Sequence, residues 1–184
     1  MTTTRRWRAL LGEGGFTLTE LLVAMSIMGI VLGGLFLVQQ QGQWAYMAGA
    51  ARVETQQNAR LTLARFVDEV RISSGITNSP NCNNVANGGT SISFAWTNPL
   101  TAVAETVTYQ LTGTNLQRTD ANGTQTLIGG VQTLNIWCYQ SDGTLTATPT
   151  NVVSVSMKIT AQDETVDSVK QHAVVQSQVR LRNL

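Results

Sequence analysis

Residues 21–38 read LLVAMSIMGIVLGGLFLV, eighteen residues that contain no charged side chain and one hydroxyl group. Extended back to Phe16, the apolar segment has 23 residues, which form a helix about 35 Å long. The hydrocarbon core of a bilayer is about 30 Å thick. The sequence therefore predicts one transmembrane helix over residues 16–38.

The charges before this segment predict its orientation. Three basic residues precede it: Arg5, Arg6 and Arg8. Because such residues stay on the cytoplasmic side, we expect a cytoplasmic N-terminus and an exported chain after Val38. A secretory signal peptide has an apolar run of about 7–15 residues and a small-residue cleavage site. Here the run is longer and three glutamines follow it, so a membrane anchor is favoured.

Glu20 places a carboxylate five residues into the apolar segment. A charge within a membrane span costs about 2.5–3.5 kcal/mol, less near the interface. Such residues are mostly functional and have a partner. The alternative is that Glu20 lies at the cytoplasmic boundary and stays hydrated.

Residues 14–24, GGFTLTELLVA, closely resemble the cleavage and methylation motif of type IV prepilins. The resemblance implies that Gly15 ends a leader peptide of residues 1–15. It also implies that prepilin peptidase cuts there and that Phe16 becomes the methylated N-terminus, with Glu20 as the fifth mature residue. Other pilins, an inner-membrane assembly platform and membrane lipid are then the expected partners, and no cofactor is implied.

Physical arguments agree with this resemblance. Gly15 lacks a Cβ atom, so the chain around it can enter a narrow protease site in extended form. Cleavage removes the three leader arginines and Glu13, which leaves nine basic and ten acidic residues among 169. Glu20 can then pair with the new amine of Phe16 in a neighbouring subunit, because a buried charge requires such a partner. In the family, this pairing helps to set subunit register.

We expect the helix to continue as an amphipathic half over residues 39–75. No proline precedes Pro80, and Ser73-Ser74-Gly75 is a stop signal. An apolar stripe recurs every three or four residues: Ala59, Leu63, Phe66 and Val70. Arg65 lies at helical ion-pair spacing from Asp68 and Glu69.

Three glycines interrupt the membrane half: Gly29, Gly33 and Gly34. Gly29 and Gly33 have GxxxG spacing, which can mark close helix contact in a bilayer. Each glycine also weakens a helix by about 1 kcal/mol. Many major pilins have a helix-breaking proline where this chain has Leu37. The sequence leaves helix contact and local weakening as equal alternatives.

Residues 76–184 form a β-rich head in this interpretation, which gives an α+β fold class with one antiparallel sheet. Residues 78–89 are expected to be a loop. Turn signals fall at residues 112–113, 122–123, 129–130 and 142–143. The expected strands are Ser91–Trp96, Glu105–Leu111, Asn115–Thr119, Gln125–Ile128, Val131–Gln140, Val152–Gln162 and Gln171–Leu181.

The second half resembles minor pilins of the PilW type and J-type pseudopilins. Three stretches carry this weaker resemblance: residues 57–71, 109–143 and 179–183. The middle stretch, with its hairpin, short strand and longer aromatic strand ending in Asp-Gly, is the most similar. Residues 76–104 are treated as variable.

Cys82 and Cys138 are the only cysteines, and both lie on the exported side. An even count in an oxidising compartment suggests one disulfide. It would tie the loop at residues 78–89 to the strand Val131–Gln140 and would contribute roughly 4 kcal/mol in the loop-entropy model. A free, buried Cys138 is the alternative.

No catalytic constellation emerges from the sequence, so we expect a protein that is not an enzyme. His172 is the only histidine, and two cysteines with one histidine do not make a zinc site. The residues Asp120 to Gly123 faintly resemble a calcium loop, but a hairpin turn is the better interpretation. Asp163, Glu164 and Asp167 could also ligate calcium, yet a solvated acidic turn is sufficient.

Composition excludes a bulk nucleic-acid binder. The net charge is +1 and charged residues make up only 12% of the chain. The chain therefore lacks the strong positive potential that attracts DNA or RNA. The basic residues of the head are too dispersed for a stripe: Arg118, Lys158, Lys170, Arg180 and Arg182.

The sequence thus predicts a minor type IV pilin-like subunit of a priming or tip complex. It would lie in the inner membrane with its head in the periplasm, and then in a pilus or pseudopilus that can reach the cell surface. Type II secretion and competence pseudopilins are not separable from it by sequence. A pilus-borne adhesive or DNA-binding module and a tethered periplasmic enzyme are the other hypotheses.

Overall fold

The computed structural model describes residues 15–97, 102–164 and 170–182. The chain divides into two compact units, Met1–Tyr46 and Met47–Leu184. The long helix α1 (Leu18–Ile72) contributes to both. Within the described residues, α1 is the one helix long and apolar enough to cross a membrane.

The first unit consists, where it is described, of residues 15–17 and the first part of α1. Its apolar side chains are exposed all around the helix, Ile30 to 77% and Phe36 to 64%. A helix that is apolar on all sides is suited to a lipid environment. The helix begins at Leu18, two residues after the predicted start at Phe16, because Thr17 caps it. It passes through Gly29, Gly33 and Gly34 without a break.

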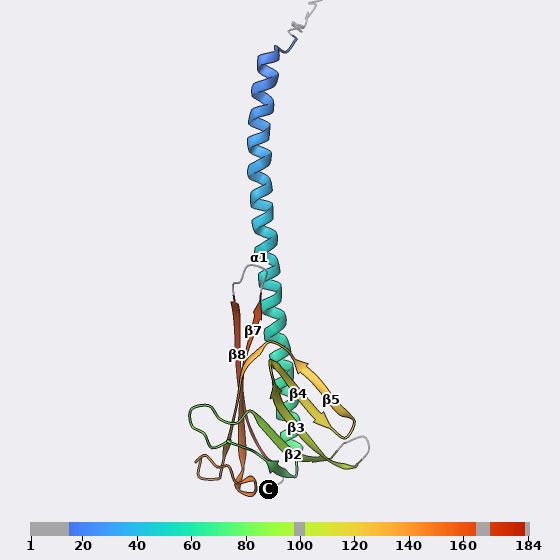
Figure 1. Ribbon diagram of the computed structural model, residues 1–184, viewed down its shortest axis with the longest axis vertical. Coiled ribbons are helices and arrows are strands. Elements are labelled where there is room, and N and C mark those ends of the chain that lie inside the picture. The colour runs from blue at the N-terminus through green and yellow to red at the C-terminus, as the bar shows by residue number, and fades with distance from the viewer. Residues whose placement is uncertain (1–14, 98–101, 165–169, 183–184) are drawn as a thin grey trace, which may run out of the picture. The chain divides into compact units, whose positions relative to one another are not determined.

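The second unit combines the C-terminal part of α1 with two antiparallel sheets (Figure 1). The first sheet has five strands in sequence order, and the second has three. The five strands are β1 (Gly75–Asn78), β2 (Ser91–Thr97), β3 (Ala104–Thr112), β4 (Asn115–Asp120) and β5 (Gly123–Ile128). The three are β6 (Val131–Tyr139), β7 (Ser154–Glu164) and β8 (Lys170–Arg180), with a short 3-10 helix, η1 (Pro149–Asn151), before β7.

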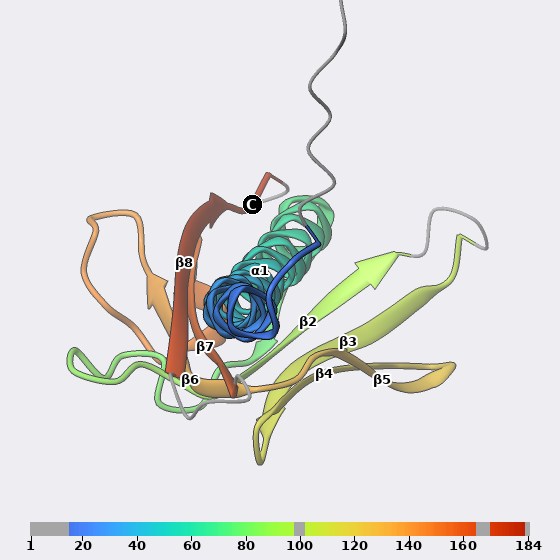
Figure 2. The ribbon, with the colours of Figure 1, turned by 90° about the horizontal axis from the view of Figure 1, so that it is seen from above.

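The core of this unit lies where α1 meets both sheets (Figure 2). The predicted stripe of Ala59, Leu63, Phe66 and Val70 is buried, with none of the four more than 5% exposed. The ring of Phe66 makes edge-on contacts with Tyr109 at 5.2 Å and Phe94 at 6.4 Å. Because edge-to-face aromatic pairs stabilise a core beyond their buried area, this contact holds α1 on the five-stranded sheet.

All seven predicted strands are confirmed, with ends within two residues of those expected. Three details differ from what was expected. The helix ends at Ile72, two residues before the expected end near Ser74, and β1 occupies residues that were expected to end the helix or to form a loop. Ser74 N–H donates to the carbonyl of Ala95 at 3.0 Å, so a strand distant in sequence draws this segment into the sheet.

The third difference is that the head has two sheets and not one. The chain changes sheet at Gly129 and Gly130, where a turn was expected. Gly130 has φ +70°, and a Cβ atom there would lie 2.5 Å from the carbonyl oxygen of Gln162. A glycine is therefore required for the chain to cross close to β7.

Candidate functional site

The segment around Gly15, Phe16 and Glu20 forms the start of α1. Thr17 N–H donates to Glu20 Oε2 at 3.1 Å, and Glu20 N–H donates to Thr17 Oγ1 at 3.3 Å. The Thr17 hydroxyl also donates to Glu20 Oε2 at 3.0 Å. This reciprocal arrangement is a capping box, which satisfies N–H groups that the first turn leaves without partners.

The junction between Gly15 and Phe16 lies just outside this cap. Both residues precede the helix, and the Phe16 side chain is 85% exposed. A Cβ atom built at Gly15 would meet nothing within 4 Å. A peptide bond that lies outside the helix and is exposed can enter a protease site without unwinding α1. Arg5, Arg6 and Arg8 lie outside the described residues.

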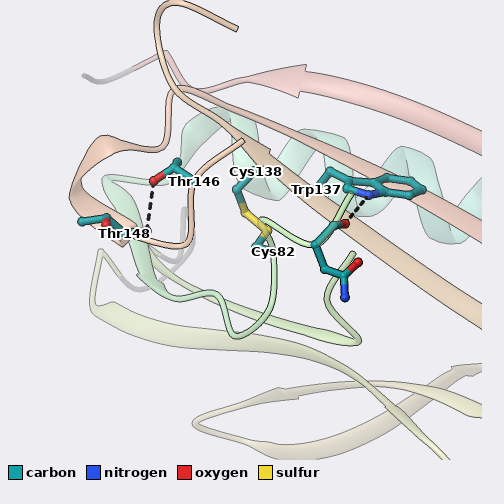
Figure 3. The surroundings of a disulfide bond; sticks show 6 residues. Cys82, Trp137, Cys138, Thr146 and Thr148 are labelled. Atoms are coloured by element: carbon teal, nitrogen blue, oxygen red, sulfur yellow. Dashed lines mark hydrogen bonds between the residues drawn. A yellow bond between two sulfur atoms is a disulfide. The ribbon is translucent and has the colours of Figure 1, made fainter. Parts of the chain in front are cut away.

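Cys82 and Cys138 form the disulfide that the sequence suggested, and both are fully buried (Figure 3). The free-cysteine alternative is therefore wrong. Cys138 N–H donates to the carbonyl of Cys82 at 3.2 Å, and the indole N–H of Trp137 donates to the carbonyl of Asn84 at 3.0 Å. The bond ties the loop after β1 to β6, as expected.

The same loop pairs with β6 further along. Gly89 N–H donates to the Ile136 carbonyl at 2.7 Å, and Ile136 N–H donates back to the Gly89 carbonyl at 2.9 Å. Gly88 has φ +59°, and a Cβ atom there would lie 2.6 Å from the Ile136 oxygen. The loop thus covers the edge of β6, which would otherwise present unpaired backbone groups.

A buried ion network joins α1 to the five-stranded sheet. Arg118 Nε lies 3.0 Å from each carboxylate oxygen of Glu69, and the Tyr109 hydroxyl donates to Glu69 Oε2 at 2.8 Å. Arg118 also pairs with Asp120, and Arg65 Nε donates to Glu69 Oε1 at 3.2 Å. The predicted helical pair of Arg65 and Glu69 is confirmed. Arg118 was expected among the dispersed cations, but it is only 3% exposed.

The network shifts the pKa values of Tyr109, Arg118 and Asp120. Burial, and then the charge of Glu69, raise the pKa of Tyr109. The hydrogen bond from Arg118 lowers the pKa of Asp120. Burial alone would lower the pKa of Arg118, but its bonds to Asp120 and Glu69 outweigh burial and raise it. These three shifts favour a protonated Tyr109 and Arg118 and an ionised Asp120, the states in which their hydrogen bonds form.

The remaining sequence candidates are not brought together. His172 is exposed on β8. Asp120 and Gly123 flank the tight β4–β5 turn, where Asn122 N–H donates to Asp120 Oδ1 at 2.8 Å. Asp163 and Glu164 lie on β7, and Asp167 lies outside the described residues. The described ranges contain no group of three or more histidine, cysteine or acidic residues that could hold a metal ion.

Comparison with known proteins adds one finding. Residues 11–36 match the family pattern described as the prokaryotic N-terminal methylation motif. No curated protein matches the sequence of this chain. The match covers the exposed Gly15–Phe16 junction and the Thr17–Glu20 cap described above. The chain therefore carries the type IV prepilin signature, and its long N-terminal helix and antiparallel sheets form a type IV pilin-like α+β architecture.

Proposed function

We propose that this chain is a minor type IV pilin-like subunit of a tip or priming complex in a pilus or pseudopilus. Prepilin peptidase cuts it after Gly15 and methylates Phe16. The observation that carries the proposal is the exposed junction beside a capped carboxylate at the start of an apolar helix. Residues 1–15 then act as leader, 16–38 as membrane half, 39–75 as amphipathic half and 76–184 as head.

Glu20 has a different role before and after cleavage in this proposal. In the precursor, Thr17 satisfies its carboxylate. Cleavage creates a cationic amine at Phe16, which needs an anionic partner once it leaves water. The Glu20 carboxylate of a neighbouring subunit supplies that partner and sets the register between the two helices. The subunit waits in the inner membrane, with its N-terminus cytoplasmic and its head periplasmic, until the assembly platform adds it to other pilins.

Processing is tested by the intact mass of the protein from native membranes, before and after reduction. We expect a chain that begins at N-methylated Phe16 and gains the mass of two hydrogens when the disulfide between Cys82 and Cys138 is reduced. A full-length chain from a host with active prepilin peptidase would overturn the processing step.

Assembly is tested by Glu20→Ala and Glu20→Gln. The amide oxygen of glutamine can still accept from Thr17 N–H, so Glu20→Gln retains the cap and loses only the charge. We expect both variants to be cleaved normally but to enter filaments about tenfold less or worse, because an unpaired amine in a dry site costs several kcal/mol. Incorporation is measured in sheared filament fractions.

Glu54→Ala is the matched control, since Glu54 is an exposed glutamate of α1 outside the membrane half. It should enter filaments as the unaltered chain does. Normal filament numbers in both Glu20 variants would show that the carboxylate does not set register.

A further inference from the structure

β8 is an edge strand of the three-stranded sheet, and within the described residues β7 is the one strand that pairs with it. Leu181 N–H donates to the carbonyl of Val153 at 2.9 Å, and the antiparallel register places Val179 opposite Val155. Hydrogen-bonded positions alternate in such a pair. The backbone N–H and C=O groups of the intervening positions therefore point away from β7. These positions are Val174, Gln176, Gln178 and Arg180, and the described part of the chain gives them no partner strand.

A groove lies between this edge and α1. Its floor includes Leu63, which is 5% exposed, together with the partly buried side chains of Val67 and Val175. Arg60 and Asp68 are exposed residues of α1 that also line it. The hollow has a volume of about 540 Å³. Its lining mixes these apolar side chains with polar ones and lies beside the strand edge of β8, a combination that suits an extended peptide.

A second hollow, of about 410 Å³, lies towards the end of β8. Its lining includes three arginines, Arg71, Arg180 and Arg182. Arg182 N–H donates to the carbonyl of Arg71 at 3.3 Å, which fixes the end of β8 beside the last turn of α1 (Figure 2). Arg65 and Arg118 have carboxylate partners, whereas none of these three arginines forms an ion pair within the described residues.

We propose that this groove receives an extended segment of a neighbouring pilin subunit, added as a further strand along β8. This inference rests on the proposed function, because it assumes assembly with other pilins. The segment pairs its backbone with β8 and places apolar side chains over Leu63, Val67 and Val175. Its carboxylates contact the three arginines, since guanidinium groups bind carboxylates in bidentate geometry. A bare phosphate or a nucleic acid would use the arginines but not the apolar floor or the strand edge.

The strand pairing is tested by comparing Gln178→Pro with Gln178→Ala in the full chain. Both variants lose the side-chain bond from Gln178 to Ser154. Only proline also removes the outward N–H, and an edge strand tolerates proline there because the bonds to β7 remain. We expect Gln178→Ala to enter filaments normally. The incorporation of Gln178→Pro into filaments should be about tenfold lower or worse. If the two variants unfold at the same urea concentration, a folding defect is not the cause of the lower incorporation of Gln178→Pro.

The charge contact is tested with Arg180→Glu against Arg52→Glu. Arg52 is an exposed arginine of α1 that lines neither hollow, so the two variants change net charge equally. We expect Arg180→Glu to lower filament incorporation about tenfold, because charge-assisted hydrogen bonds are lost and repulsion replaces them. Arg52→Glu should behave as the unaltered chain does.

Amide hydrogen exchange gives a direct readout of the paired edge. In filaments, the outward amides of Gln176 and Gln178 should exchange at least about tenfold more slowly than in the free chain in detergent. The groove proposal would be overturned if these amides exchanged at the same rate in filaments and if Gln178→Pro entered filaments to the same extent as Gln178→Ala. If only Arg180→Glu lost filament incorporation, the arginines would form an anion site without strand pairing. This result would also overturn the proposal.

These outcomes are distinct from failure of the proposed function. If the proposed function is wrong, the unaltered chain itself is absent from filaments or remains unprocessed. If only the groove proposal is wrong, the unaltered chain is processed and incorporated into filaments, and so is Gln178→Pro.

Discussion

Glu69→Ala is expected to lower the free energy of unfolding by about 3–5 kcal/mol, the usual cost of removing one partner from a buried ion pair. The variant takes both carboxylate oxygens from Arg118 and, within the described ranges, the acceptor of the buried Tyr109 hydroxyl. The guanidinium group would retain Asp120 but remain buried at 3% exposure. The unfolding midpoint in urea, followed by tryptophan fluorescence of the full chain in detergent, measures the effect.

A double variant separates pairing from packing. Glu69→Leu with Arg118→Met removes both charges and retains apolar volume, so its loss of stability should be smaller than that of Glu69→Ala. Glu54→Ala is again the control, because an exposed glutamate on the same helix should change stability by less than about 0.5 kcal/mol. If Glu69→Ala matched this control, the network would contribute nothing measurable to holding α1 on the sheet.

Removal of the disulfide, by Cys82→Ala with Cys138→Ala, is expected to cost about 2–4 kcal/mol. The two residues are 56 positions apart, so the bond limits a long loop in the unfolded chain. The loss of stability should appear as a lower midpoint of the same urea unfolding transition, since the bond ties the loop after β1 to β6.

Reduction of the unaltered chain is the control for this variant. The reduced chain and the double variant should have the same midpoint within about 1 kcal/mol, because both have lost the same constraint. A double variant as stable as the oxidised chain would show that the backbone bonds between Gly89 and Ile136 hold the loop without the disulfide.

The elements were largely predictable because their signals are local. The stripe from Ala59 to Val70 follows the helical repeat, and it is the face that α1 buries. The turns at Gly113, Gly123, Gly130 and Gly143 all have positive φ, which only glycine adopts without strain. Such signals depend on a few neighbouring residues, so the sequence predicts the strands between them well.

Long-range partners were not predictable in the same way. β1 exists because β2 pairs with it, and its own four residues show no strand pattern. Arg118 has the same sequence signal as an exposed lysine or arginine on a strand. Its burial depends on Glu69 and Tyr109, which are 49 and 9 residues away in the chain. The arginines of the second hollow come from α1 and from the end of β8 and the residues after it, more than a hundred positions apart.

The sequence by itself determined the prepilin signature, the apolar helix and the β-rich character of the head, because each is encoded by adjacent or periodic residues. Only the tertiary structure decided that the head has two sheets, that Arg118 is buried against Glu69, and that β8 is an edge strand beside α1. The physical reason is that burial and pairing depend on which distant segments meet. The free energy that favours one arrangement over another comes from many contacts spread over the core.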